Sequence, residues 1–190
     1  MDDVLDEPRI KRHRLNVEQY HRMGESGVFA ADARVELIEG EVIEMAPMGT
    51  RHYAAVSRLT KLLTRAVGDA ALVNAQLPVR LNVMSEPEPD LSILKPRADY
   101  YASALPTGAD VLWVIEVADS SLAYDVKVKA DLYARNSVPA YWIVDLQASV
   151  LRVFTNPRDG SYADTSLITA PAVIALPGLD DLAVDLTGLL

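Results

Sequence analysis

Two acidic residues of this chain lie where apolar residues predict the ends of buried strands. Glu116 follows the apolar run at residues 111–115. Asp90 follows Pro89 directly and immediately precedes the predicted strand at residues 91–94. Burying a carboxylate is unfavourable unless a cation, a metal ion or hydrogen-bond donors compensate its charge. Carboxylates from neighbouring strands can converge on one divalent cation, and oxygen-only ligation suits Mg²⁺ or Mn²⁺. The pattern favours a metal site at one end of a sheet, just before a helix.

Each acid also has a structural explanation that involves no chemistry. Glu116 can cap the helix that follows it or pair with a lysine. Asp90 can be a turn residue at the start of a strand. The residue pattern alone leaves both explanations open.

Lys129 is the cation that the predicted helix at residues 122–135 can direct toward the sheet. On a helical wheel of about 100° per residue it lies at the edge of the apolar stripe that includes Val126, whereas Lys127 faces water. Asp125 precedes Lys129 by four residues, and a surface pair between these two side chains is the alternative explanation of both.

Glu36 and His52 are weaker candidates. Glu36 lies among apolar neighbours in a predicted hairpin, and His52 lies near the start of a long predicted helix. A lone histidine at a helix start is more often a surface residue or a hydrogen-bond donor than a ligand, and the other two histidines show no metal-ligand spacing with it. The sequence contains no Ser-His-Asp arrangement, glycine-rich phosphate loop or nucleotide fingerprint.

The candidate residues are positioned by an alternation of strands and helices that predicts an α/β fold. The segment before the first glycines predicts a short helix, and the chain then continues through a β-hairpin into a long amphipathic helix. The predicted helices cover residues 17–23, 51–67 and 122–135. The predicted strands cover residues 35–38, 41–45, 71–76, 78–83, 91–94, 111–118, 140–145, 150–154 and 161–168. Residues 171–190 are expected to form a weak helix or a tail over the core.

Composition sets the broad class. With 190 residues and 50% hydrophobic content, the chain suits one domain over residues 15–190, preceded by a flexible charged segment at residues 1–14. The absence of cysteine excludes disulfides, thiolate zinc sites and cysteine nucleophiles, and favours a cytoplasmic location. No apolar run approaches the roughly 18 residues of a membrane span, so no membrane partner is expected.

Charge is distributed unevenly along the chain. The formal net charge of −9 argues against a general nucleic-acid coat protein, but a local basic surface could still bind DNA. The candidate cations are clustered near the N-terminus and on the first long helix, and none follows Arg158. They are Arg9, Lys11, Arg12, Arg14, Arg51, Arg58, Lys61 and Arg65. We expect the acidic C-terminal segment to face away from any DNA.

Several short motifs, taken in order, resemble the Uma-two family of endonucleases in the PD-(D/E)XK, restriction-endonuclease-like superfamily. The motifs are Glu36 to Glu41, Met45 to Pro47, His52, Pro89-Asp90, Glu116 to Ala118, Asp125, Lys129 with Tyr133, and Val138 to Asp145. The resemblance implies a restriction-endonuclease-like mixed central β-sheet flanked by helices. It also implies magnesium-dependent phosphodiester chemistry at one end of that sheet.

The resemblance implies roles for individual residues. Asp90 is similar to the first motif acid and Glu116 to the second, with the backbone carbonyl of Val117 as a third metal ligand. The motif lysine would stand at Ala118, and family members of this kind supply it from the following helix, which points to Lys129. The chain departs from the family again at residues 119–120, where Asp-Ser replaces a serine-proline pair.

The resemblance also implies further roles for Glu36 and His52. Glu36 would hold a second ion or position water, and His52 would contact phosphate or transfer a proton. The leading interpretation is a Mg²⁺- or Mn²⁺-dependent endonuclease that hydrolyses DNA, with a homodimer as one candidate assembly. The alternatives are a nuclease-like binding or scaffold module without turnover and a metal-dependent hydrolase of small phosphoesters.

Overall fold

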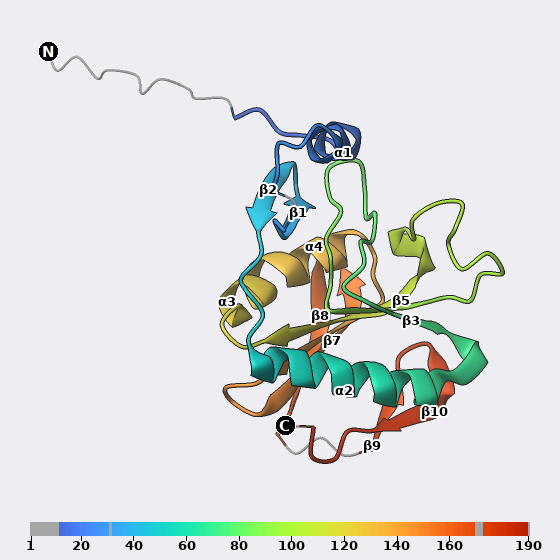
Figure 1. The fold of residues 1–190 in the computed structure, drawn as a ribbon. Helices are drawn as coiled ribbons and strands as arrows, with labels where there is room; N and C mark the ends of the chain where they lie inside the picture. Colours follow the sequence, from blue (N-terminus) through green and yellow to red (C-terminus); the bar gives the residue numbers. More distant parts are fainter. Residues whose placement is uncertain (1–11, 31, 170–172, 190) are drawn as a thin grey trace, which may run out of the picture.

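A six-stranded mixed sheet forms the centre of the protein in a computed structural model that describes residues 12–30, 32–169 and 173–189 (Figure 1). The strands lie in the order β3-β4-β5-β6-β7-β8, and only the central pair β5 and β6 is parallel. Their bounds are β3 Leu72–Ala75, β4 Leu91–Leu94, β5 Val111–Ala118, β6 Ala140–Asp145, β7 Val150–Arg158 and β8 Ser161–Ile168. The predicted mixed sheet is thereby confirmed.

The two central strands are covered on both faces. All six residues of β6 are buried, and in β5 only Leu112 is partly exposed. Side chains alternate between the two faces of a strand, so Trp113 and Ile115 point to one layer and Glu116 to the other. Glu116 therefore contacts the helical layer on the opposite face of the sheet from the layer that Trp113 and Ile115 contact.

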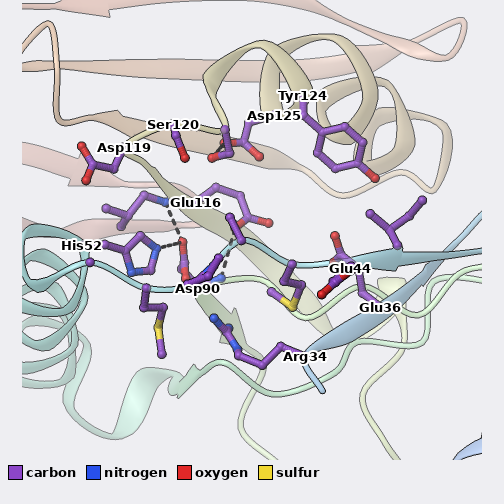
Figure 2. A pocket seen from close by; sticks show the side chains of 18 of the residues that line it. Arg34, Glu36, Glu44, His52, Asp90, Glu116, Asp119, Ser120, Tyr124 and Asp125 are labelled. Carbon is purple, nitrogen blue, oxygen red and sulfur yellow. Dashed lines mark hydrogen bonds and ion pairs between the residues drawn. The ribbon is translucent and has the colours of Figure 1, made fainter. Parts of the chain in front are cut away.

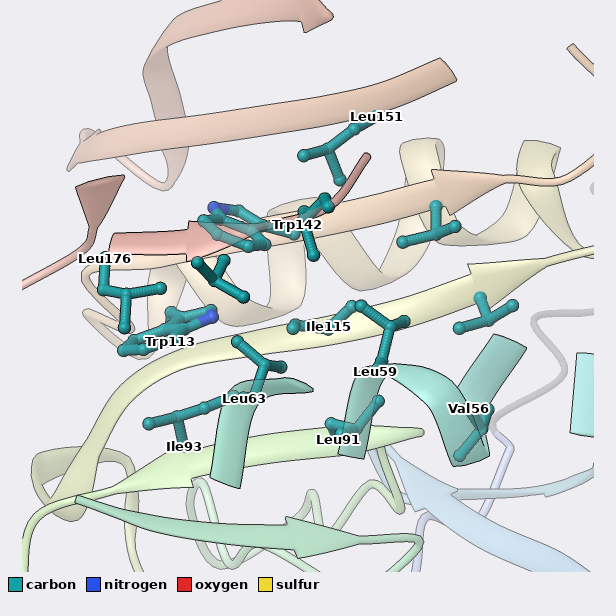
Figure 3. Close-up of a cluster of buried hydrophobic side chains, with 14 of the residues drawn as sticks. Val56, Leu59, Leu63, Leu91, Ile93, Trp113, Ile115, Trp142, Leu151 and Leu176 are labelled. Carbon is teal, nitrogen blue, oxygen red and sulfur yellow. The ribbon is translucent and has the colours of Figure 1, made fainter. Parts of the chain in front are cut away.

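One face of the sheet packs against α2, Thr50–Val67, in the main apolar cluster (Figure 3). Leu59 and Leu63 of α2 pack there with Trp113 and Trp142, whose ring centroids are 5.8 Å apart. The apolar positions of α2 recur every three or four residues, which produces this buried face. The first turn of α2 lies beside the start of β4, where His52 contacts Asp90.

The opposite face is covered by the segment that connects β5 to β6. It comprises α3 (Leu122–Tyr124), a π-helical segment labelled η3 (Asp125–Lys129) and α4 (Ala130–Arg135). Tyr133 of α4 packs here on Tyr141 of β6, with ring centroids 5.0 Å apart. The sequence predicted one regular helix over these residues. In the structure the backbone N–H of Ala130 bonds instead to the carbonyl of Asp125, which widens one turn.

The N-terminal part lies beside the main sheet as a helix and a hairpin (Figure 1). Helix α1, Val17–Glu25, begins at Asn16, whose side chain accepts from the backbone of Gln19. Strands β1 (Val35–Ile38) and β2 (Glu41–Glu44) form a separate two-stranded antiparallel sheet. Two short 3₁₀ turns, η1 (Gly68–Ala70) and η2 (Gly108–Asp110), complete the regular structure up to β5.

The C-terminal segment differs from the expected weak helix or tail. It forms an antiparallel hairpin of β9 (Val173–Leu176) and β10 (Leu179–Asp185), turned at Gly178 with φ +73°. Leu176 of β9 and Val184 of β10 are buried in the apolar cluster that also contains the buried face of α2. Side chains alternate between the two faces of a strand, so each strand of the hairpin turns an apolar residue toward this cluster. Arg58 of α2 donates to the carbonyl of Gly188, so this acidic segment packs against α2. That it faces away from any bound DNA remains a prediction.

Residues 78–83 do not form the predicted strand. Only an isolated bridge joins Arg80 to Thr107, and Asn82 bridges Ser85. Pro78 lacks an amide donor, and Pro87 and Pro89 lack one in the facing segment, so a continuous ladder cannot form.

Most of the segment predicted to be flexible, residues 1–14, lies outside the described residues. Of its end, Arg14 pairs with Glu41 at 3.4 Å. No helix in the described parts of the chain has the length and hydropathy needed to cross a membrane.

Candidate active site

The two acids identified in the sequence meet at one end of the sheet. Asp90 directly precedes β4, and β4 is antiparallel to β5, with Leu91 opposite Ile115. The backbone N–H of Asp90 donates to Oε2 of Glu116 at 3.3 Å, and the N–H of Val117 donates to Oδ2 of Asp90 at 2.9 Å (Figure 2). The register of two neighbouring strands therefore fixes both carboxylates.

Lys129 reaches these acids from the helical layer. Its Nζ lies 2.9 Å from Oε1 of Glu116 and 3.2 Å from Oε1 of Glu36. The hydroxyl of Tyr133 donates to the same Glu116 oxygen at 3.2 Å. Lys127 is exposed, so the predicted orientation of the two lysines is confirmed. The surface-pair explanation of Asp125 and Lys129 is wrong, because both side chains are buried.

Four buried carboxylates surround this one ammonium group. Glu36, Asp90, Glu116 and Asp125 are between 2% and 6% exposed, as is Lys129 at 4%. Glu36 reaches the site from β1, and its Oε2 accepts from the N–H of Glu88 at 3.2 Å. Asp125 accepts from the hydroxyl of Ser121 at 2.5 Å. Among the described residues Lys129 is the only buried lysine or arginine, so negative charge is in excess.

This excess of negative charge, together with burial, shifts the pKa values of the side chains in the cluster. Burial raises the pKa of Glu116 well above its ordinary value; Lys129 opposes that shift, while Asp90, Asp125 and Glu36 add to it. Burial also raises the pKa of Asp125. Burial alone would lower the pKa of Lys129, but Glu116 and Glu36 outweigh it and raise that pKa. An added proton or cation would therefore be stabilised here.

His52 and Tyr124 present polar atoms without partners. Nε2 of His52 lies 2.9 Å from Oδ2 of Asp90, and this contact is a hydrogen bond to the carboxylate in the tautomer that carries its proton on Nε2. Nδ1 of His52 and the hydroxyl of Tyr124 are buried without a hydrogen-bond partner among the described residues. Burial, followed by the charge of Glu36, raises the pKa of Tyr124 to about 12, which keeps its hydroxyl protonated.

The cluster forms the floor of a cavity of about 320 Å³ (Figure 2). One wall is mostly apolar and comes from β2 and the segment that leads to α2; Glu44 of β2 and Arg34 also line the cavity. The opposite wall is the loop after β5 with the start of α3. The residues that line the cavity include Ile43, Met45, Ala46, Pro47 and Met48 on the first wall and Asp119, Ser120, Ser121 and Tyr124 on the second. The cavity gives small molecules access to otherwise buried carboxylates.

The donor set suits a hydrated divalent cation. No three His, Asp or Glu side chains in the described part of the chain converge as a ready-made ligand set. Mg²⁺, however, usually keeps several waters and takes only one or two protein carboxylates. Asp90 and Glu116, with the carbonyl of Val117, would fit that mode, and the excess of buried negative charge favours it. Glu116 would exchange some of its present hydrogen bonds for the ion.

Sequence analysis did not identify Tyr124 or Gln76 as site residues. Gln76 follows the end of β3, and its Nε2 donates to Oδ1 of Asp90 at 3.4 Å. Tyr124 precedes Asp125 in the widened helical turn and lines the cavity. No spacing in the sequence marks either residue, because their positions depend on the packing of β3 and on the π-helical turn.

Comparison with known proteins identifies the family. Residues 17–187 match the model of the Uma2 family, described as "Putative restriction endonuclease". The chain belongs to the Uma2 family. The match extends from α1 to beyond β10 and so includes every candidate site residue of this Uma2 protein. The resemblance inferred from its short motifs is confirmed.

A solved structure shares the fold. The crystal structure of "a putative nuclease belonging to DUF820" from Anabaena variabilis matches this Uma2 protein with a TM-score of 0.70 and 17% sequence identity. The match covers 92% of this chain and 97% of the other. The nuclease-like architecture of the sheet and helices is therefore confirmed.

A second relative matches only in part. The phosphatidylserine decarboxylase proenzyme of Rhodococcus erythropolis is 33% identical over 88 residues. That segment is 46% of the Uma2 chain and 37% of the decarboxylase proenzyme. The match is too short to assign the Uma2 protein an activity.

Proposed function

We propose that this Uma2 protein is a metal-dependent endonuclease that hydrolyses phosphodiester bonds in DNA, with Mg²⁺ or Mn²⁺ as cofactor. The observation that carries the proposal is the excess of four buried carboxylates over one buried ammonium group at the floor of an open cavity. A fold that buries uncompensated charge favours a cation there. Membership of a family described as "Putative restriction endonuclease" supports the reaction class.

Asp90 and Glu116 would hold the ion, with the carbonyl of Val117 as a third protein ligand. When bound, the ion would polarise the scissile phosphate and lower the pKa of an attacking water. The hydrogen bonds from the Val117 N–H and from His52 hold the Asp90 carboxylate in place. Lys129 would orient the water and offset negative charge on the phosphate in the transition state.

Glu36 and His52 would complete the proton transfers. Glu36 forms an ion pair with Lys129 and so helps to hold its ammonium group in the site. It can also position water or a second ion. The unpartnered Nδ1 of His52 can accept a proton or, when protonated, donate to a phosphate oxygen. Water would attack phosphorus and lose a proton to Nδ1 of His52. The bond to the leaving oxygen would break, and that oxygen would take up a proton from the His52 imidazolium or from solvent.

The second candidate function is a nuclease-like binding module without turnover. One observation favours it: both carboxylate oxygens of Glu116 already accept hydrogen bonds within the protein, from Lys129, Tyr133 and the N–H of Asp90. A site stabilised in this way would hold its shape without an ion. It would bind DNA through surface cations alone.

DNA would meet the basic side of α2. Lys61 and Arg65 are exposed, whereas Arg51 pairs with Asp119 at 3.5 Å and Arg58 donates to Gly188. The cytoplasmic location, the homodimer and the single domain over residues 15–190 remain our predictions from the sequence.

The test combines ion binding with turnover on one purified preparation. Calorimetry would measure Mg²⁺ and Mn²⁺ binding, and a supercoiled plasmid would report nicking. Asp90→Asn keeps the shape of the side chain and removes its charge, so ion binding and nicking should both be lost. Asp69→Asn, at an exposed aspartate in η1, is the matched control. DNA binding without ion binding or nicking by the wild type would favour the binding module.

A further inference from the structure

A second hollow adjoins the acid-floored cavity. It has a volume of about 370 Å³ and lies between α2 and the end of β3, with Met48, Tyr53, Val56 and Gln76 in its lining. Met48 also lines the first cavity, so the two share a wall. The second hollow contains no carboxylate, and Met48, Val56 and the ring of Tyr53 give it apolar surface.

Gln76 connects this hollow to the acids. Its amide contacts Sδ of Met48 and donates to Oδ1 of Asp90 at 3.4 Å. Its backbone has φ +54°, in the left-handed region that residues other than glycine rarely adopt. A group bound in the second hollow would therefore lie next to the phosphate that Asp90 and its metal would hold.

Tyr53 forms an exposed aromatic surface at this hollow. Its side chain is 66% exposed, and neighbouring Met48 is 42% exposed. On α2 it shares one face with Ser57 and Thr60, which also line the hollow and carry no charge. Nucleic-acid bases stack on such aromatic faces without regard to sequence. An exposed aromatic residue beside a site for phosphate chemistry fits an unpaired base.

The depth of the acids limits what can reach them. Asp90, Glu116 and Lys129 are 4–6% exposed and open only to a cavity of about 320 Å³. That volume is at the low end of the roughly 300–1,000 Å³ typical of small-molecule pockets. A duplex exposes its phosphates but keeps its bases paired and stacked, so only an unpaired base can turn into the second hollow beside the cavity. Enzymes that do chemistry on a base likewise act on single strands or on nucleotides that leave the stack.

We propose that the hollow around Tyr53 and Met48 is a stacking site for the unpaired base next to the scissile phosphate. The substrate class is then single-stranded or locally unpaired DNA, and intact duplex is a poorer substrate. This inference rests on the proposed nuclease function and specifies its substrate. Tyr53 binds substrate and takes no part in proton transfer.

The test separates binding from cleavage. Fluorescence anisotropy with Ca²⁺ would measure the affinity of the full chain for a labelled single-stranded oligonucleotide and for the same sequence as a blunt duplex. Cleavage of both DNAs would be followed with Mg²⁺. The variants are Tyr53→Ala, Tyr53→Phe and, as a control, Tyr100→Ala, which removes another exposed tyrosine from the loop after β4.

We expect the single strand to be bound more tightly and cut faster than the duplex. Tyr53→Ala should weaken single-strand binding by about 5- to 150-fold, the range measured for stacking one base on an aromatic ring. Tyr53→Phe and Tyr100→Ala should bind like the wild type, because Phe keeps the stacking face.

Two results would overturn the inference in distinguishable ways. Equal cleavage of duplex and single strand, or wild-type affinity in Tyr53→Ala, would refute the stacking site while leaving the nuclease function intact. An absence of binding and cleavage with both DNAs would refute the nuclease function and this inference together.

Discussion

Replacing Lys129 by methionine would test the charge balance of the site most directly. Methionine occupies similar space but leaves Glu116 and Glu36 without the ammonium group that lies 2.9 Å and 3.2 Å from them. Removing one partner of a buried ion pair costs about 3–5 kcal/mol. For a chain of this size each kcal/mol lowers Tm by roughly 2–4 °C, so Tm should fall by roughly 6–20 °C.

The loss should depend on pH in a defined direction. The pKa of Glu116 is already raised in the folded protein, and removal of Lys129 raises it further. Between about pH 4.3, the ordinary glutamate value, and that raised pKa, the folded state binds more protons than the unfolded state. The free energy of unfolding then falls as pH rises. Lys129→Met should therefore be more destabilising at pH 8 than at pH 5.

The assay is thermal unfolding at both pH values, followed by plasmid nicking with Mg²⁺ at a temperature where all variants are folded. Lys127→Met is the matched control; its exposed side chain should change stability by no more than about 0.5 kcal/mol and leave nicking nearly intact. Equal effects of the two substitutions on nicking would refute the assignment of Lys129. A pH-independent loss of stability would refute the charge argument.

Three further predictions concern the ion, the DNA surface and the core. Mg²⁺ should raise Tm more at pH 8 than at pH 6, because Glu116 must lose a proton to bind the ion; an equal rise would place the ion elsewhere. Neutralising Lys61 and Arg65 together should flatten the log–log salt dependence of DNA binding by up to about two units, measured by anisotropy against salt. Trp113→Ala should cost about 3–5 kcal/mol in urea unfolding, since this side chain is fully buried; a loss below about 1 kcal/mol would contradict its place in the core.

The parts of the fold that sequence analysis predicted are those with strong local periodicity. The central strands β5 and β6 are continuous apolar runs, and α2 repeats its apolar residues every three or four positions. The same reasoning oriented Lys129 toward the sheet, even though its helix contains a π-helical turn that a regular wheel does not describe. Local patterns were sufficient wherever one face of an element is clearly buried.

The errors arose where distant contacts decide the structure. The hairpin of β9 and β10 is short and largely exposed, and its few buried residues pack on α2, more than a hundred positions earlier in the chain. Asp125 has the spacing of a surface pair, yet it is buried by the cavity wall. Tyr124 and Gln76 join the site only through tertiary packing, which local spacing does not encode.

The β1–β2 hairpin gives the site a dynamic property of its own. Glu36 belongs to this separate sheet, which is held to the rest of the chain partly by the paired hydrogen bonds between Leu37 and Glu86. Such a unit can open without global unfolding, and each opening would withdraw one carboxylate from Lys129. Hydrogen exchange at the Leu37 amide would measure how often this happens. The fraction of time in which the proposed catalytic set is complete would then be governed by a local opening equilibrium.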